Sequence, residues 1–429
     1  KIFKIKNFKL LILMAKKTKI IKNLAIIFFF GISSGLPISL VLSTLKALLV
    51  DQGFDLKTIG FFSLVSIPYS LKFFFAPVID SSALPYLSKK FGQRKSWIIF
   101  SQLLLIIFIA GLGMVQITSS ITLIAIFALL IAIASASQDV VIDAYRIEII
   151  KNQDQGFATS CYVYGYRIGM LISGALALAL ADLMSWYWVY YLMSFFMAGC
   201  IVTTLLADES RADWYKNNAS KKFDFNLWFR NFVIEPFVDF TKHRNWLLIL
   251  IFIILFKLTD IFAGNLTLPF LMDLGFTKVE IATIIKTFGL FATLLGVLIG
   301  GFLVKKLGLY RSLWIAILMQ GLSNLSFAYL AQIGNNSSLL YLVILVENSS
   351  GGIGDAVFVA YLSGLCNVAF SATQYALLSS LASFSRSFLS ASGGIFAQFL
   401  GWFGFFILST LLVIPSIILL FFITFNKKN

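Results

Sequence analysis

Charged residues are scarce in this chain, and that scarcity excludes a water-soluble protein. Asp, Glu, Lys and Arg make up 12% of the 429 residues, whereas hydrophobic residues make up 59%. Ordinary soluble domains are roughly one-quarter charged. So few charged side chains cannot cover a protein of 47.8 kDa against water. The chain must therefore lie largely in a lipid bilayer.

Cysteine and histidine are also rare, and common enzymatic motifs are missing. Cys161, Cys200 and Cys366 lie in apolar sequence without Cys-x-x-Cys spacing, and His243 is the single histidine. This pattern argues against a disulfide framework and a zinc site, so we expect no metal and no cofactor. A phosphate-loop motif is absent too, and the Gly-x-Ser-x-Gly pattern of a nucleophile elbow occurs only at residues 31–35, inside an apolar run. We expect a protein that is not an enzyme and that draws its energy from an ion gradient.

Long apolar runs predict an all-α integral membrane protein. One crossing needs about 20 apolar residues, so the chain has room for about twelve. The predicted spans cover residues 22–49, 58–79, 97–116, 119–147, 157–181, 187–207, 246–271, 279–304, 313–332, 339–363, 369–395 and 402–425.

The basic residues predict the orientation of these spans. The net charge of +15 comes from short blocks between apolar runs, which argues against nucleic-acid binding. Most Lys and Arg lie in the two tails and in alternate loops, namely residues 81–95, 146–154, 208–245 and 305–311. The opposite loops carry Lys57, Lys278 and Arg386. Because cytoplasmic loops are enriched in Lys and Arg, both termini are expected in the cytoplasm.

Composition also predicts the domain boundaries. Residues 1–21 form a basic tail, in which 1–13 is either an upstream extension before Met14 or a segment lying on anionic lipid. Two six-helix bundles are expected at residues 22–207 and 246–425, followed by a short cytoplasmic tail at 426–429. The aromatic central loop, 208–245, fits either a helix at the membrane surface or a linker.

An internal repeat supports two related bundles. At an offset of about 216 residues, Asp51-Gln-Gly-Phe54 matches Asp273-Leu-Gly-Phe276, and the segment 139–145 matches 355–361. Two parallel six-helix halves are the layout of the major facilitator transporters, whose substrate site lies between the halves near the bilayer midplane.

Several longer motifs resemble the AmpG-type muropeptide permeases. They are Gly31-Ile-Ser-Ser-Gly35-Leu-Pro37, Ala136-Ser-Gln138-Asp139, Gly165-Tyr-Arg167, Lys257-Leu-x-Asp260, Lys286-Thr-x-Gly289 and Phe370-Ser-Ala-Thr-Gln374. The resemblance covers about residues 24–420. It implies proton-driven import of N-acetylglucosaminyl-1,6-anhydro-N-acetylmuramyl peptides from periplasm to cytoplasm, for peptidoglycan recycling. It also implies a monomer in the bacterial inner membrane, with the bilayer, protons and the muropeptide as its partners.

The loop after the second span resembles the gating loop of the superfamily. Asp80 is followed by Gly92 and Arg94, as in the Asp…Gly-x-Arg motif, although with an insertion between them. We expect Asp80 to pair with Arg146 in a cytoplasmic latch.

Charged residues inside spans are the candidates for proton transfer. Asp139 and Asp143 are four residues apart on one helix face, where each carboxylate raises the proton affinity of the other. Alternatively, Asp143 pairs structurally with Arg146 or Arg167.

A second group of charged residues is predicted in the other half. Lys257 and Asp260 share a helix face, and Lys286 is expected to compete for Asp260. Asp355 joins this predicted charge switch. A fixed ion pair between two helices is the alternative.

The predicted substrate site combines cations with amides. Arg167 and Arg386 suit the carboxylates of a stem peptide, because a guanidinium binds a carboxylate in two places. Gln138 and Gln374 suit sugar hydroxyls or acetamido groups, or else bond between helices. Glu347 is assigned to the same site.

Other functions are compatible with the same architecture. A carrier of acetyl-CoA or of a phosphorylated metabolite and a drug exporter are rivals within the transporter class. A wall-fragment sensor that does not transport belongs to another class. A membrane-embedded enzyme is the weakest alternative, because the aqueous loops carry no His or Asp cluster with metal-ligand spacing.

Overall fold

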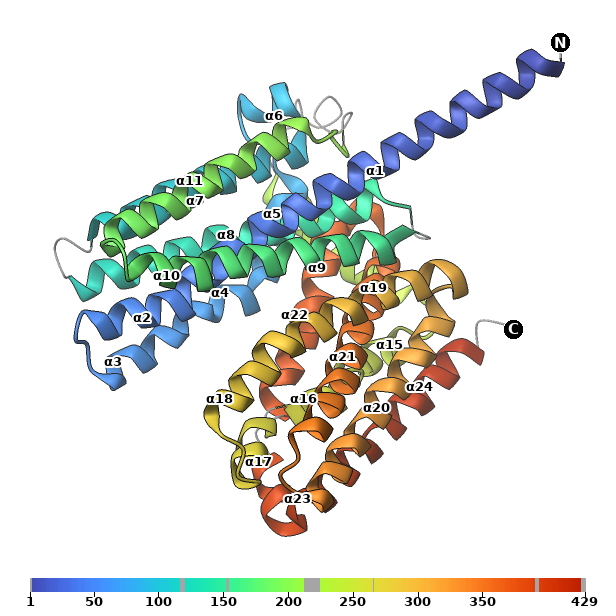
Figure 1. Ribbon diagram of the computed structural model, residues 1–429. Coiled ribbons are helices and arrows are strands. Elements are labelled where there is room, and N and C mark those ends of the chain that lie inside the picture. The colour runs from blue at the N-terminus through green and yellow to red at the C-terminus, as the bar shows by residue number, and fades with distance from the viewer. Residues whose placement is uncertain are drawn as a thin grey trace. The chain divides into compact units, whose positions relative to one another are not determined.

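The protein is a bundle of helices throughout the part of the chain that can be described. The computed structural model describes residues 2–115, 120–151, 154–211, 224–264, 266–389 and 393–425. All regular secondary structure in these ranges is helical (Figure 1). The all-α fold class predicted from the sequence is therefore confirmed.

The described chain divides into two compact units. Unit 1 comprises Lys1–Lys151, Cys161–Ile234 and Val368–Ala376, and unit 2 comprises Asn152–Ser160, Glu235–Asn367 and Leu377–Asn429. The start of one helix of each predicted bundle thus belongs to the opposite unit. The predicted bundle boundaries stay a prediction, and parts of the tails and of the central loop lie outside the described residues.

Most of the helices of unit 1 lie before residue 235. They are α1 (Ile2–Val41), α2 (Ser43–Asp51), α3 (Leu56–Phe61), η1 (Phe62–Ser66), α4 (Ile67–Ser70), η2 (Lys72–Phe74), α5 (Ala76–Ser81), α6 (Leu87–Phe91), α7 (Gln93–Val115), α8 (Ile121–Ile149), α9 (Gln155–Leu171), η4 (Ile172–Leu176), α10 (Ala177–Ala181), α11 (Trp186–Leu206), α13 (Phe225–Phe229) and η5 (Arg230–Ile234).

The remaining helices belong to unit 2, except for residues 368–376 at the start of the eleventh predicted span, which belong to unit 1. They are α14 (Glu235–Thr241), α15 (Trp246–Leu255), α16 (Leu258–Gly264), α17 (Thr267–Asp273), α18 (Lys278–Ile281), η6 (Ala282–Phe288), α19 (Gly289–Leu307), α20 (Leu309–Ile333), α21 (Ser337–Leu365), η7 (Val368–Phe370), α22 (Ser371–Leu389), α23 (Gly393–Leu411) and α24 (Val413–Phe425).

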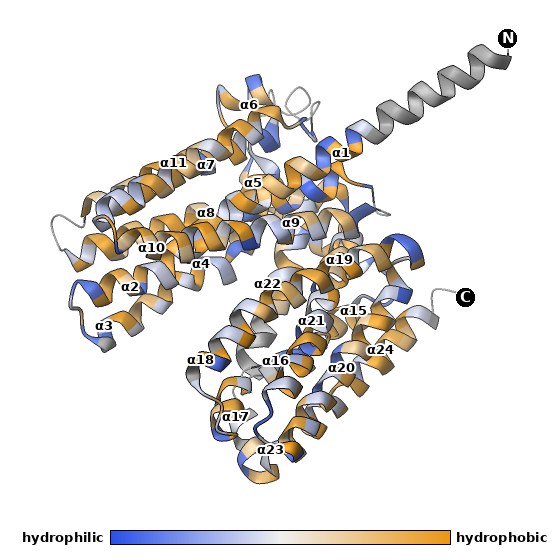
Figure 2. Cartoon of the chain, in the orientation of Figure 1, coloured by the Kyte–Doolittle hydropathy of each residue, from blue (hydrophilic) through white to orange (hydrophobic). Residues whose placement is uncertain are grey.

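Ten helices among the described residues are long and apolar enough to cross a membrane. They coincide with all the predicted spans except 58–79 and 369–395. Hydrophobic residues dominate these long helices in both units (Figure 2), and many of their large apolar side chains are exposed. Such surfaces need lipid rather than water as solvent.

The predicted span 58–79 is a series of short helical turns instead of one helix. It comprises α3, η1, α4, η2 and α5. Pro68 and Pro77 stand at the starts of α4 and α5, where a residue without an N–H group costs no hydrogen bond. The predicted span 369–395 begins with η7 and continues as α22, whose described side chains include several serines.

Glycines allow close helix contacts in both units. A Cβ at Gly31 or Gly35 of α1 would collide with the backbone at Tyr162 or Tyr166 of α9. Gly165 of α9 meets the backbone of Phe28 in the same way. In unit 2, Gly296 and Gly300 of α19 lie against α21. Small residues bring these helix backbones together.

Candidate functional site

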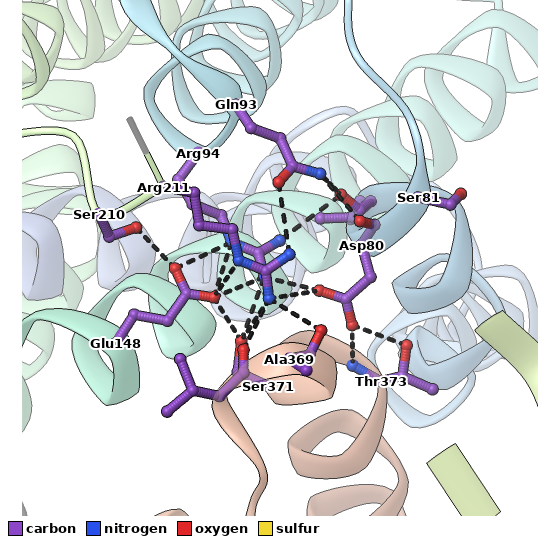
Figure 3. A network of polar contacts seen from close by, with 12 residues as sticks. Asp80, Ser81, Gln93, Arg94, Glu148, Ser210, Arg211, Ala369, Ser371 and Thr373 are labelled. Carbon is purple, nitrogen blue, oxygen red and sulfur yellow. Dashed lines mark hydrogen bonds and ion pairs between the residues drawn. The ribbon is translucent and has the colours of Figure 1, made fainter. Parts of the chain in front are cut away.

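A buried network of charged groups lies in unit 1 around Asp80 (Figure 3). The Arg94 guanidinium donates to Asp80 Oδ1 at 2.6 Å and to Glu148 Oε1 at 2.7 Å. Asp80 Oδ2 accepts two further hydrogen bonds, from the backbone N–H of Thr373 at 2.8 Å and from its hydroxyl at 2.9 Å. The α5 carboxylate thereby anchors the start of α22 within unit 1.

A second arginine, Arg211, completes this network. Its Nε lies 2.9 Å from Glu148 Oε1, and one of its terminal nitrogens donates to the Val368 carbonyl at 2.8 Å. Ser371 and Ser210 also donate to Glu148. Two guanidiniums thus face two carboxylates, which is the balance of charge that a buried network requires.

Gly92 and Glu209 complete the loop before α7. Gly92 has φ +85°, a conformation that glycine adopts without strain. A Cβ there would meet the Glu209 side chain, whose carboxylate accepts from the N–H groups of Arg94 and Lys95 at 3.1 and 3.0 Å. Glu209 therefore binds the first free N–H groups of α7, where a negative charge is favourable.

The expected pairing of Asp80 with Arg146 is wrong. Arg146 NH2 lies 3.3 Å from Asp143 Oδ1, one turn earlier on α8. Asp80 pairs with Arg94 and Arg211 instead. The pairing of Asp143 with Arg146, which the sequence left open, is the one observed.

A second polar group in unit 1 surrounds Asp139 and Asp143 of α8. Lys72 of η2 lies 3.7 Å from Asp143 Oδ2, so two cations approach this carboxylate. Asp139 is partly buried, and its Oδ1 has no hydrogen-bond partner among the described residues. The two aspartates share a helix face, but their surroundings differ.

Tyr375 of α22 provides an aromatic face to these cations. Arg146 Cζ lies 5.5 Å from its ring centroid and Lys72 Nζ lies 5.8 Å from it. Cations at such distances are attracted to an aromatic ring. Lys72 and Arg146 are therefore held between Asp143 and the ring.

The other predicted substrate residues of unit 1 differ from one another in their surroundings. Gln138 is buried, and its amide bonds Ser33 of α1 through Ser33 Oγ at 3.1 Å and Ser33 O at 2.9 Å. This is the helix-to-helix bond that was the alternative for Gln138. Arg167 lies on α9, and its Nε is buried without a hydrogen-bond partner among the described residues. Gln374 is buried on α22.

The predicted charge switch of unit 2 is present in part. Lys257 lies at the break between α15 and α16, where its Nζ is 3.0 Å from Asp260 Oδ2 and 2.6 Å from Asp355 Oδ1. Gln320 of α20 donates to Asp260 at 3.5 Å. The side chain of Lys286, the third expected member, lies outside the described residues, as does that of Arg386.

Glu347 lies beside this cluster on α21. Its Oε2 accepts from the Ser323 hydroxyl at 2.7 Å, and it lies one helical turn before Gly351, against which the Asp260 carboxylate packs. The sequence assigned Glu347 to substrate binding. That assignment stays a prediction.

An exposed ion pair between α1 and Asp208 contrasts with these buried groups. Lys22 Nζ lies 2.8 Å from Asp208 Oδ1, and both side chains are more than 40% exposed. The hydrogen bond from Lys22 lowers the pKa of Asp208 below its usual value. Such an exposed pair contributes little to stability.

Sequence reasoning missed Lys72, Glu148, Glu209, Arg211 and Tyr375. A lysine inside the apolar run 58–79 was a usable signal for Lys72, because an ionisable group within a span indicates a partner. No spacing links Glu148 to Arg211 or to Ser371, since these residues are far apart in the chain. Tertiary contact alone brings them together.

Comparisons with known proteins cover almost the whole chain. The sequence profile of the Major Facilitator Superfamily matches residues 27–388. The anhydromuropeptide permease of Escherichia coli (strain K12) is 38% identical over 398 residues, which are 92% of this chain and 78% of the permease. The putative transporter AmpG 4 of Rickettsia felis is 34% identical and aligns over 96% of this chain and 99% of its own length.

Solved structures share the fold at much lower sequence identity. The proton:xylose symporter XylE has a TM-score of 0.68 and 13% identity, covering 95% of this chain and 96% of its own. The human organic anion transporter MFSD10 has a TM-score of 0.66 and 14% identity, with 93% of this chain and 99% of its own covered.

Proposed function

The chain belongs to the major facilitator superfamily and, within it, to the AmpG permeases, and from this we propose that it imports 1,6-anhydromuropeptides from periplasm to cytoplasm. Membership makes the protein a membrane transporter of small molecules rather than an enzyme. The resemblance predicted from the sequence motifs is confirmed. Proton drive, the inner membrane as location and a monomeric state are parts of the proposal.

The observation that carries the substrate is the 38% identity to the E. coli anhydromuropeptide permease. That identity extends over 92% of this chain and so includes the helices that carry both charged clusters. The substrate would be a sugar–peptide conjugate with several carboxylates. A binding site for it needs cations that are not already neutralised.

Arg167 supports an anionic substrate. Its guanidinium is partly buried, and its Nε lacks a hydrogen-bond partner among the described residues. Burying such a donor without a partner is unfavourable. A substrate carboxylate would supply the missing acceptor and could bind the guanidinium at two atoms. We propose Arg167 as the main carboxylate-binding residue, with Gln374 and Arg386 as further contacts.

The groups around Asp139 support proton coupling. An ionisable group inside a span is costly when charged, and here the ion pairs of Lys72 and Arg146 are with Asp143. Asp139 Oδ1 has no hydrogen-bond partner in the described part of the chain. A proton on Asp139 would remove its charge. We propose that Asp139 takes up and releases a transported proton while Asp143 holds the cations.

The basic residues support an orientation with both termini in the cytoplasm. The loops that carry them lie between alternate spans, as the positive-inside rule requires. In this orientation the Asp80 network and the central loop face the cytoplasm. The protein would then bring wall fragments to cytoplasmic recycling reactions.

Uptake by cells that lack their own permease tests the proposal directly. Cells expressing the full chain should accumulate labelled anhydromuropeptide, and a protonophore should abolish accumulation while ATP is intact. Accumulation that persists without the proton gradient would contradict proton drive. Tight binding without uptake would favour the sensor, and uptake of acetyl-CoA or export of drugs instead would favour the corresponding carrier.

A further inference from the structure

A cluster in unit 2 contains more carboxyl groups than cations. Lys257 is its one cation among the side chains that the structure describes, whereas Asp260, Asp355 and Glu347 supply three carboxyls. Asp260 and Asp355 both lie within 3.0 Å of the Lys257 ammonium. With every group ionised, the cluster would carry a net negative charge inside membrane-spanning helices, which is costly.

Glu347 is the carboxyl that lacks a cation in this cluster. No ion pair to it exists among the described residues; it accepts from the Ser323 hydroxyl, and it lies one helical turn before Gly351, against which the Asp260 carboxylate packs. Two adjacent carboxyls do not both stay ionised, because their like charges repel. The ionised form of Asp260 is stabilised by the Lys257 ammonium and by the hydrogen bond from Gln320. The proton therefore belongs on Glu347.

Gln320 of α20 adds a buried polar group to this cluster. It is 1% exposed, and its Nε2 donates to Asp260 while its Oε1 has no hydrogen-bond partner among the described residues. The amide packs against Gly354, and the Asp260 carboxylate lies against Gly351, both on α21. Two glycines one turn apart thus leave room for polar groups beside Glu347.

We propose that Glu347 is a second proton-binding residue of this transporter and that Asp260 accepts its hydrogen bond. The inference rests on the proposed proton drive and adds a site in unit 2. The internal repeat places Asp355 opposite Asp139, but Asp355 lies 2.6 Å from Lys257 and is held as its counter-ion. Glu347 takes the role that the repeat would give to Asp355.

Proton release from Glu347 would change the pairing in the cluster. The Glu347 carboxyl would lose its proton to water and become a carboxylate next to Asp260. Two carboxylates would then compete with Asp355 for Lys257, and their repulsion favours a rearrangement of α16 against α21. The Asp355 side chain is 40% exposed, so the cluster is not fully enclosed within unit 2.

Infrared spectroscopy of the purified full chain in lipid vesicles tests this site. A protonated carboxyl absorbs apart from a carboxylate, so the wild type should show a protonated-carboxyl band that titrates with pH. Glu347→Gln should lose the part of this band that remains in Asp139→Asn. Glu280→Gln is the matched control, because Glu280 bonds Thr277 and Ser337 outside the cluster. An unchanged band in Glu347→Gln would overturn the proposal.

A second variant covers the case in which Glu347→Gln does not fold. Glu347→Asp keeps a carboxyl but draws it back from Asp260, so its titration midpoint should shift; an unshifted midpoint would contradict the site. In uptake assays, folded Glu347→Gln should keep substrate exchange and lose accumulation. If the wild type transports no muropeptide, the proposed function fails, whereas the infrared band still decides whether Glu347 binds a proton.

Discussion

Asp139 and Asp143 show at the scale of single residues how different neighbours separate two identical side chains. Asp143 lies near two cations, Arg146 and Lys72. Asp139, one turn away, keeps a buried oxygen without a hydrogen-bond partner in the described structure. A carboxyl in that position gains most from a proton.

Replacing Asp139 with Asn should uncouple transport from the proton gradient. The amide imitates the protonated carboxyl, so we expect the variant to exchange substrate across the membrane but not to accumulate it. Counterflow and net uptake in the same vesicles measure the two activities. Early melting with parallel loss of both would assign Asp139 a structural role, and normal accumulation would exclude it as the proton carrier.

Replacing Arg167 separates charge from shape. Arg167→Ala should lose uptake, and Arg167→Lys should recover only part of it, because an ammonium cannot reproduce a two-atom contact with a carboxylate. A loss of one such contact corresponds to about 1.5–3 kcal/mol, or roughly a tenfold to hundredfold weaker substrate affinity. Substrate Kd measured on the purified variants checks this. Equal affinity of Arg167→Lys and the wild type would indicate simple charge balance.

The sequence predicted candidate residues better than it predicted their partners. Asp139, Asp143, Lys257 and Asp260 stood out because charged groups are rare within apolar runs. The Lys257–Asp260 pair could be predicted because three residues separate them on one helix face. The pairing of Asp80 could not, because nothing in the sequence shows that Arg94 lies beside Asp80 in place of the expected Arg146.

At the scale of helices, the apolar runs predicted location better than continuity. The runs at 58–79 and 246–271 were expected as single helices, yet the first consists of short turns and the second is broken at Lys257. Hydropathy does not detect such breaks. In a membrane, interrupted helices occur where protein or water satisfies the freed backbone groups, which is consistent with Lys72 and Lys257 lying at these interruptions.

Contact between α1 and α9 gives a test at the same scale. Gly165→Ala should destabilise the protein by about 1–3 kcal/mol, because its Cβ would overlap the Phe28 carbonyl. Gly199→Ala on α11 is the control, since no heavy atom lies within 4 Å of its Cβ. There alanine should be neutral or slightly stabilising. Thermal unfolding of both variants in detergent decides; equal melting temperatures would contradict close packing at Gly165.

At the scale of the whole molecule, two kinds of charged contact differ in how much they contribute to the free energy of unfolding. The Asp80 network is buried and joins α5, α7, α8 and the start of α22 within unit 1. The Lys22–Asp208 pair is exposed. A buried charge that loses its partner is strongly unfavourable, whereas exposed pairs are screened by water and salt.

Removing one charge from each kind of contact should therefore have unequal effects. Glu148→Gln leaves Arg94 and Arg211 with only Asp80 as a counter-charge, and we expect a loss of about 3–5 kcal/mol in unfolding free energy. Asp208→Asn, the control, should cost less than about 1 kcal/mol, and less still at high salt. Thermal or denaturant unfolding of the purified variants measures both.

Adding Arg211→Gln to Glu148→Gln distinguishes charge balance from local packing. The double variant again has one cation and one carboxylate, Arg94 and Asp80. These two groups lie 2.6 Å apart in the wild type. If uncompensated charge causes the loss, the double variant should be more stable than Glu148→Gln alone. If Glu148 acts through its hydrogen bonds to Ser210 and Ser371, removing Arg211 should destabilise the protein further, because its bond to the Val368 carbonyl is lost as well. The sign of the interaction energy between the two substitutions therefore separates the two explanations.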